Sequence, residues 1–285
     1  LARAGAVANN NGGLVASNPN PAEDTQGAGY DNQGGYTQAK GDLRIDASRI
    51  DNSGASLIRA GGTATLASAE LINRDTQGGQ DQGIEAMDLN IQTPELLDNT
   101  RGAVRAARDA RITSAGRVDN SAGLISAQRN LEVLDPLARV PGADARAKTL
   151  AITNTGGTLV AGQDLRVDAA RLTSDGSTTA KRDMGIALTQ DVVNNGEVGA
   201  NGNDSYTTTG NFTNHGKLVA GQTLTVAGRN VDNTAGAKMF GDSSAAFTVG
   251  GLTNAGDLLS DGTLSLNANA ARGASFTNTG NVDGT

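Results

Sequence analysis

HGKLVAGQTLTVAGRNVDNTAG, residues 215–236, repeats a phrase that the chain has already used in NTGGTLVAGQDLRVDAARLTS, residues 154–174. The shared core is LVAGQ-x-L-x-V, which begins at Leu159 and again at Leu218. In repeat proteins each copy is one structural unit that buries its apolar edge only against the next copy. The repetition therefore predicts a stacked architecture and defines the unit to look for in the rest of the chain.

A short turn marks each copy of the unit, and it consists of Asn, one or two small residues and then Gly. The turn asparagines are Asn52, Asn99, Asn120, Asn154, Asn194, Asn214, Asn233, Asn254 and Asn278. Asn194 and Asn214 are 20 residues apart. The 40-residue interval from Asn154 to Asn194 has Ser174 at its midpoint. The period is therefore about 20 residues, which suits one coil of a solenoid.

Apolar and polar residues alternate in short pieces around each turn, as in Leu165-x-Val167 and Leu224-x-Val226. Alternation of period two is typical of β-strands, and Asn and Gly between the pieces favour left-handed backbone positions in tight turns. Short strands, tight turns and this period predict an all-β chain, folded as one continuous parallel β-solenoid over residues 1–285. About ten to twelve coils, at about 4.8 Å each, would give a rod roughly 50–60 Å long.

Equivalent asparagines in such a stack can bond to one another through their side-chain amides. We therefore expect the turn asparagines to form a ladder, and we expect replacement of Asn214 or Asn254 by Ala to lower stability rather than activity. A leucine-rich repeat also has a period near 20 and an asparagine ladder. Its L-x-x-L-x-L-x-x-N pattern and its return segment do not match the copies in this chain.

Four stretches depart from the period, and we predict that they project from the stack as loops. They are residues 17–42, 74–88, 134–149 and 199–209. All are polar or rich in Gly and Pro. Loops on a rigid scaffold commonly carry recognition. Tolerated insertions without a function are the plainer alternative, and both interpretations stay open for each loop.

Composition argues against several classes of function. The chain has 285 residues and a net charge of −7 from 23 basic and 30 acidic side chains, which disfavours nucleic acid and anionic membranes as main partners. It has no Cys, which excludes disulfides and thiolate metal sites, and no apolar run that predicts a transmembrane helix. The chain begins at Leu1 without a signal-peptide pattern, so we expect an internal piece of a longer protein.

Two sets of side chains are candidates for contact with a partner. The basic set is Arg105, Arg108 and Arg111, and the aromatic set is Tyr30, Tyr36 and Tyr206. The arginines align with outward positions of the repeat, which predicts a solvated charged face. The sharper hypothesis is a basic stripe that binds an acidic glycan or a lipopolysaccharide phosphate. The tyrosines fall in predicted loops, where exposed rings would stack on sugars.

A β-helical polysaccharide lyase or hydrolase is the enzymatic alternative. Such enzymes cluster carboxylates on one face, often around calcium. Here Asp51, Asp98 and Asp119 each directly precede the turn Asn, which marks a position of the repeat and not a local active site. The calcium-binding G-G-x-G-x-D repeat is also missing from the sequence. The sequence therefore predicts no catalytic residue, no metal ligand and no cofactor.

The pattern apolar-x-Asn-x-Gly-x-Leu-x-Ala-x-x-x-Leu-x-Val resembles the repeats of filamentous hemagglutinin. That family includes the large exoproteins of two-partner secretion and the contact-dependent growth inhibition toxins. The clearest copies are residues 152–167, 212–226 and 252–266, with weaker copies at 50–66, 97–112 and 118–133. The resemblance implies a right-handed parallel β-helix in the shaft of a protein that Gram-negative bacteria export.

The same resemblance implies a function. The expected role is a rigid structural or adhesive segment of a secreted, cell-surface exoprotein, which contacts a receptor or glycan on a host cell or a neighbouring bacterium. The expected partner of the parent protein is the outer-membrane β-barrel transporter of two-partner secretion. The alternative is a receptor-contacting or stalk segment of a contact-dependent growth inhibition toxin.

Overall fold

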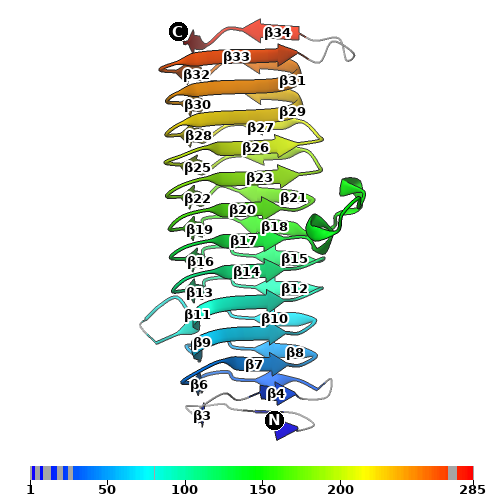
Figure 1. Cartoon of the computed structure of the whole chain (residues 1–285), viewed down its shortest axis with the longest axis vertical. Coiled ribbons are helices and arrows are strands. Elements are labelled where there is room, and N and C mark those ends of the chain that lie inside the picture. Colours follow the sequence, from blue (N-terminus) through cyan, green and yellow to red (C-terminus); the bar gives the residue numbers. More distant parts are fainter. Residues whose placement is uncertain are drawn as a thin grey trace.

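The chain folds into a parallel β-solenoid of about 12 turns, with about 21 residues in each turn. The computed structural model describes residues 28–79, 81–268 and 275–284, together with four short strands between residues 2 and 24. Figure 1 shows the coils stacked along one long axis, with the N-terminal strands at the bottom and β34 at the top. The fold class predicted from the repeat is confirmed.

Each coil contributes one strand to each of three faces, and each strand pairs in parallel with its equivalents one coil before and one coil after. Face A contains β1 (Ala2–Arg3), β4 (Ala22–Asp24), β7 (Leu43–Asp46), β14 (Ala110–Thr113), β17 (Leu131–Leu134), β20 (Leu165–Asp168), β23 (Met184–Leu188), β26 (Asp204–Thr208) and β33 (Thr263–Ala268).

Faces B and C follow face A in each coil. Face B contains β2 (Val7–Ala8), β5 (Tyr30–Asp31), β8 (Arg49–Asp51), β10 (Glu70–Ile72), β12 (Leu96–Asp98), β15 (Arg117–Asp119), β18 (Ala151–Asn154), β21 (Arg171–Ser174), β24 (Val192–Asn194), β27 (Phe212–Asn214) and β34 (Ser275–Asn278). Face C contains β3 (Leu14–Ser17), β6 (Tyr36–Ala39), β13 (Ala103–Ala106), β16 (Leu124–Ala127), β19 (Thr158–Ala161), β22 (Ser177–Ala180), β25 (Glu197–Ala200), β28 (Lys217–Ala220), β30 (Lys238–Gly241), β32 (Asp257–Ser260) and β35 (Asn281–Asp283).

Four long strands run through a corner and serve two faces each. They are β9 (Leu57–Ala67) and β11 (Gly83–Gln92), which pass from face C to face A, and β29 (Thr223–Asn233) and β31 (Ser244–Asn254), which pass from face A to face B. The three bends of a coil are named below as the A–B, B–C and C–A corners. Every coil therefore presents the same three faces and the same three corners.

The core is built from stacks of equivalent inward side chains. On face A, Ile45, Leu66 and Ile91 lie in register. Ile112 and Val133 continue the same stack. All five are 0% exposed. Complete burial of such a side chain contributes about 1.5–3 kcal/mol, and a coil obtains it only from the coils on either side.

Close stacking explains most of the glycines at the B–C corner. A Cβ at Gly123 would lie 2.2 Å from the carbonyl oxygen of Asn99 in the preceding coil, and one at Gly196 would meet another backbone oxygen at 2.1 Å. The predicted left-handed conformation occurs at Gly156, with φ of 59°. Ala122 adopts it too, with φ of 50°. Glycine is therefore needed mainly because the neighbouring coil leaves no space for a side chain.

Two of the predicted loops project from the stack. The segment between β17 and β18 contains two short 3-10 helices, η1 (Pro136–Arg139) and η2 (Ala145–Ala147), and Figure 1 shows it, in green, reaching out from the side of the stack. A second projection, in cyan, lies between β10 and β11. The predicted loop 74–88 extends too far, because β11 already begins at Gly83.

The other two predicted loops are largely parts of coils. Residues 199–209 were predicted to project, but they belong to β25, a corner and β26. The predicted loop 17–42 contains β5 and β6, while its residues 18–21 and 25–27 lie outside the described residues. These predictions were wrong because polar outward positions and corner glycines of an ordinary coil resemble a loop in composition.

Candidate functional site

The B–C corner holds a ladder of buried asparagine amides. Asn99 Nδ2 donates to Asn120 Oδ1 at 2.7 Å, and Asn120 Nδ2 donates to Asn154 Oδ1 at 2.8 Å. Asn99 Nδ2 also donates to the carbonyl oxygen of Leu124 in the next coil at 3.1 Å. These three asparagines are 0% exposed. The bonds form away from water, where they tie neighbouring coils together and fix their register.

The ladder runs through most of the described chain in one direction. Its donors and acceptors, in order, are Asn32, Asn52, Asn73, Asn99, Asn120, Asn154 and Ser174, and then Asn194, Asn214, Asn233, Asn254 and Asn278. Ser174 Oγ accepts from Asn154 Nδ2 at 3.3 Å. No hydrogen bond joins the side chains of Ser174 and Asn194, so the ladder is interrupted at this point.

Sequence reasoning missed two members of the ladder, Asn32 and Asn73. Asn73 is followed by Arg-Asp-Thr, so it lacks the Gly that marks the other turns. The signal that finds both is the inward residue two positions earlier, in Tyr30-x-Asn32 and Leu71-x-Asn73. The spacing between the buried residue and Asn is therefore a better marker of this position than the following Gly.

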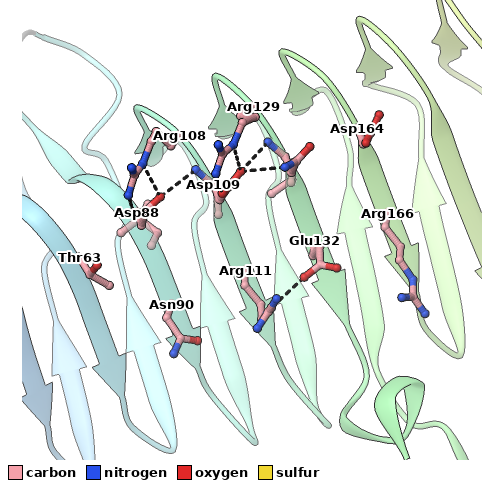
Figure 2. A pocket seen from close by; sticks show the side chains of 14 residues that line it. Thr63, Asp88, Asn90, Arg108, Asp109, Arg111, Arg129, Glu132, Asp164 and Arg166 are labelled. Carbon is pink, nitrogen blue, oxygen red and sulfur yellow. Dashed lines mark hydrogen bonds and ion pairs between the residues drawn. The ribbon is translucent and has the colours of Figure 1, made fainter.

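A shallow groove of about 610 Å³ lies on face A and the C–A corner. Figure 2 shows arginines and acids from successive coils alternating along it. Arg108 Nε donates to Asp88 Oδ1 at 3.1 Å. Arg111 Nε donates to Glu132 Oε2 at 2.8 Å. Both bonds join neighbouring coils, so these arginines lie side by side with carboxylates and do not form an unpaired basic stripe.

Arg105, the third arginine of the predicted set, lies on face C and is also engaged. Its Nη1 donates to the carbonyl oxygen of Gln82 at 3.0 Å and lies 3.3 Å from Glu85 Oε1. The ion pairs of these arginines are partly exposed to solvent, and pairs of this kind contribute little stability individually. The pairs nevertheless repeat along the stack, and each engages a guanidinium group that a ligand anion would need.

The arginine pairs keep neighbouring carboxyl groups charged. The hydrogen bond from Arg108 is the main cause that lowers the pKa of Asp88 below its usual range. Arg129 has the same effect on the pKa of Asp109, one coil later. Both carboxyl groups are therefore ionised at neutral pH, and each can form an ion pair with the arginine of the next coil.

Tyr30 and Tyr206 are core residues, so the prediction that they form a contact surface was wrong. They are 1% and 2% exposed. The ring of Tyr206 stacks on Phe212, with ring centroids 4.7 Å apart, and Tyr206 pairs in register with Ile186. Both tyrosines occupy inward strand positions, because the period-two alternation continues through the predicted loops. Tyr36, on β6, is half-buried.

Asp204 is a carboxyl group inside the core. It is 1% exposed, and both carboxyl oxygens lack a hydrogen-bond partner. Its register partners on face A are Met184 and Leu224. Burial raises the pKa of Asp204 to about 8, so the group is mostly protonated at neutral pH. A solitary buried carboxyl has no second acid, base or metal ligand with which to perform chemistry.

The described residues also lack other arrangements that would point to a site of chemistry. No group of three or more His, Cys, Asp or Glu side chains among them is placed to hold a metal ion. His215 lies in a ladder turn, where its Nδ1 is 2.9 Å from Thr234 Oγ1.

Among the residues that the structure describes, no helix has the length and apolar character needed to cross a membrane.

Comparison with known proteins identifies the repeat. The haemagglutinin repeat family matches residues 2–122, 88–134, 142–216, 189–239 and 241–285. No solved structure matches the chain.

Two curated proteins are similar to the chain. The 16S rRNA endonuclease CdiA of Enterobacter cloacae subsp. cloacae is 28% identical over 199 residues, which are 69% of this chain and 5% of that protein. The deoxyribonuclease CdiA of Dickeya dadantii is 29% identical over 244 residues, which are 84% of this chain and 7% of that protein. The chain thus spans only a small part of either relative. Because the repeat matches nearly its whole length, the chain belongs to the haemagglutinin repeat family.

Proposed function

We propose that this chain is a shaft segment of a large secreted exoprotein at the surface of Gram-negative bacteria. Its task is mechanical: it keeps other parts of the protein at a distance and offers a surface for contact. The observation that carries this proposal is the continuous parallel stack, in which strands and the asparagine ladder join successive coils along one axis. Such a stack is stiff because bending it would separate hydrogen-bonded coils.

The family match supports the same conclusion. The haemagglutinin repeat occurs along the whole chain, and the similar segments of the two curated relatives are only 5% and 7% of those proteins. The nuclease activities in their names belong to those proteins. This segment is an array of equivalent coils without a local cluster of catalytic groups among its described residues, which favours a structural role.

Export through an outer-membrane transporter is part of the proposal. Each coil makes its contacts with the coils directly before and after it, so a chain that emerges end first can fold one coil at a time. The family of two-partner exoproteins makes a dedicated β-barrel transporter the expected partner of the parent protein. A stalk segment of a contact-dependent growth inhibition protein is the second candidate, favoured by the two CdiA relatives.

Two measurements test the proposed function. Small-angle X-ray scattering of the purified chain should give the profile of a rod, and a compact globule would contradict the shaft. Binding of the labelled chain to epithelial cells and to Gram-negative bacteria should then be compared. Saturable binding to epithelial cells alone favours an adhesin, and saturable binding to bacteria alone favours the growth inhibition stalk. Binding to neither would leave a spacer without a contact role.

A further inference from the structure

The insertion between β17 and β18, residues 135–149, is fastened at its base. Asp135, 2% exposed, accepts the backbone N–H of Leu137 at 2.9 Å through Oδ1. Its Oδ2 accepts the N–H groups of Thr149 at 2.8 Å and Leu150 at 3.0 Å. One buried carboxylate therefore bonds to both ends of the insertion. This arrangement holds the two short helices in a defined position beside the stack, as a preorganised binding element requires.

A groove of about 530 Å³ lies between this insertion and the A–B corner. Arg146 of η2 lines one side of it. The corner residues come from four successive coils, at 189–191, 208–210, 227–229 and 248. Three intervals of about 4.8 Å separate four coils, so the groove is long enough for a short oligosaccharide and not only for a single ion.

Two arginines in this groove differ from those of the first groove, on face A and the C–A corner. No side-chain hydrogen bond or ion pair joins Arg146 or Arg229 to any residue that the structure describes, and both are exposed. At the C–A corner and on face A, by contrast, Arg108 and Arg111 are occupied by carboxylates of neighbouring coils. The groove therefore offers two guanidinium groups whose donors are available to an anion. Guanidinium donors bind carboxylate, sulfate and phosphate oxygens strongly and with fixed geometry.

The remaining groups of the groove suit a hydroxylated ligand. Thr189 and Thr248 contribute hydroxyl groups that can accept or donate hydrogen bonds. The hydroxyl of Thr209 donates to the carbonyl oxygen of Thr189 at 2.8 Å and can still accept. None of the described residues that line the groove is aromatic, so a neutral sugar would gain no stacking from them. Asp191 is the one acid among the described lining residues, and its Oδ1 already accepts the backbone N–H of Asn211 at 2.7 Å. Charge and hydroxyl contacts together favour an acidic saccharide over a neutral one.

We propose that this groove binds an acidic oligosaccharide, with Arg146 and Arg229 holding its carboxylate or sulfate groups. The proposal gives a ligand class to the contact role described above and rests on that proposed function. Arg146 approaches the ligand from the fastened insertion and Arg229 from the stack. The two arginines thus reach the ligand from two different elements that line the same groove.

Isothermal titration of the full chain tests the proposal with three probes of equal length. They are a galacturonate tetrasaccharide, a sulfated galactose tetrasaccharide and a neutral galactose tetrasaccharide. At least one acidic probe should bind and the neutral one should not, and the comparison of the two acidic probes identifies the preferred anion. The double variant Arg146→Ala with Arg229→Ala should weaken binding at least tenfold, because two charge-assisted contacts are lost. Arg111→Ala is the matched control and should change binding less than twofold.

Three results would overturn the proposal. They are the absence of binding by either acidic probe at millimolar concentration, equal binding of the neutral probe, and equal losses in the double variant and in Arg111→Ala. Arg146→Lys adds a further check, because it keeps the charge but loses the forked donors, and it should lie between the wild type and Arg146→Ala. Small-angle scattering from the same samples reports the rod shape independently. A rod that binds no acidic probe would contradict the groove proposal alone, whereas a compact globule would contradict the proposed shaft function.

Discussion

The coils of residues 43–134 and those of residues 171–208 share one repeat but differ in their asparagine ladder and in their core. In the first region the ladder is unbroken from Asn52 to Asn120, and the face A stack is entirely aliphatic. In the second region Ser174 interrupts the ladder, and Asp204 places an unpartnered carboxyl group in the core. Below, these regions are called the regular coils and the Ser174 coils.

Smaller defects occur in both regions and do not explain the difference. The buried hydroxyl of Thr178 lacks a partner in the Ser174 coils, but those of Ser68 and Thr93 lack one in the regular coils. The contrast therefore rests on the ladder and on the carboxyl group. A solenoid tolerates such defects because every coil is held by two neighbours, but its stability is local. The Ser174 coils are expected to exchange their amide hydrogens faster than the regular coils.

The largest expected effect is that of Asp204→Leu, which should stabilise the chain. The pKa of Asp204 is about 8 in the fold, against 3.8 for an ordinary Asp. The folded state therefore keeps a proton that the unfolded state releases. The contribution of this carboxyl group to the free energy of unfolding is fully present below about pH 4. It falls by about 1.4 kcal/mol per pH unit as the pH rises toward 8. Leu is apolar like the register partners Met184 and Leu224, and because it does not ionise, the variant does not lose this stability as the pH rises.

Urea unfolding at pH 5, 6.5 and 8 measures the effect. The gain from Asp204→Leu should grow with pH and reach on the order of 4 kcal/mol near pH 7. The carboxyl groups of Asp88 and Asp109 have lowered pKa values, so their contribution is lost only in stronger acid, below this window. Asp261→Asn, at an exposed position, is the control and should change stability by less than about 0.5 kcal/mol. A gain of the same size at all three pH values would show that Asp204 is not titrating.

The second prediction compares two positions of the ladder. Asn214→Ala should lower the free energy of unfolding by about 2–4 kcal/mol, because the buried side-chain oxygen of Asn233 loses its donor and the amide of Asn194 loses one of its acceptors. Ser174→Ala should cost less than about 1 kcal/mol, because the ladder is already interrupted there. Thermal and urea unfolding measure both, and hydrogen exchange locates the change. Equal losses at the two positions would mean that ladder continuity does not contribute to stability.

Much of the fold follows from the sequence. The period of the turn asparagines gave the coil length, and the alternation of Leu and Val gave the strands. When residues 99–112 are aligned with residues 154–167, Arg105 falls on Val160 and Arg111 on Arg166. The stacked strands have the same register. These features are local or periodic, so a single chain contains enough copies to reveal them.

Long-range packing was harder to predict. Tyr206 looked like a loop residue because Gly and Asn surround it, although its stacking on Phe212 depends on how the chain turns at two corners. The groove beside the insertion was not predicted at all. It joins Arg146 to residues 189–248, and nothing in the sequence shows how far the insertion reaches along the stack. Which arginines remain unpaired depends on contacts between coils, and composition does not reveal these contacts.

The third prediction repairs the ladder in the Ser174 coils. Ser174→Asn should stabilise the chain by about 1 kcal/mol, because a buried amide can both accept from Asn154 and donate to Asn194. Ser174→Ala is the matched control and should not stabilise. Hydrogen exchange of peptides across residues 171–208 should slow toward that of the regular coils only in the Asn variant. Unchanged exchange would show that the interruption is not what distinguishes the two regions.

The smallest expected effect lies in the regular coils, at Ala122. This residue has φ of 50°, and the equivalent turn position one coil later is Gly156, with φ of 59°. A side chain in this left-handed conformation costs about 1 kcal/mol, part of which is offset by the lower flexibility of Ala in the unfolded chain. Ala122→Gly should therefore raise stability by roughly 0.5 kcal/mol, measured by urea unfolding. Gly156→Ala is the reverse change and should lower it by a similar amount. If Ala122→Gly lowered stability instead, the greater flexibility of Gly in the unfolded chain would outweigh the relief of the left-handed conformation.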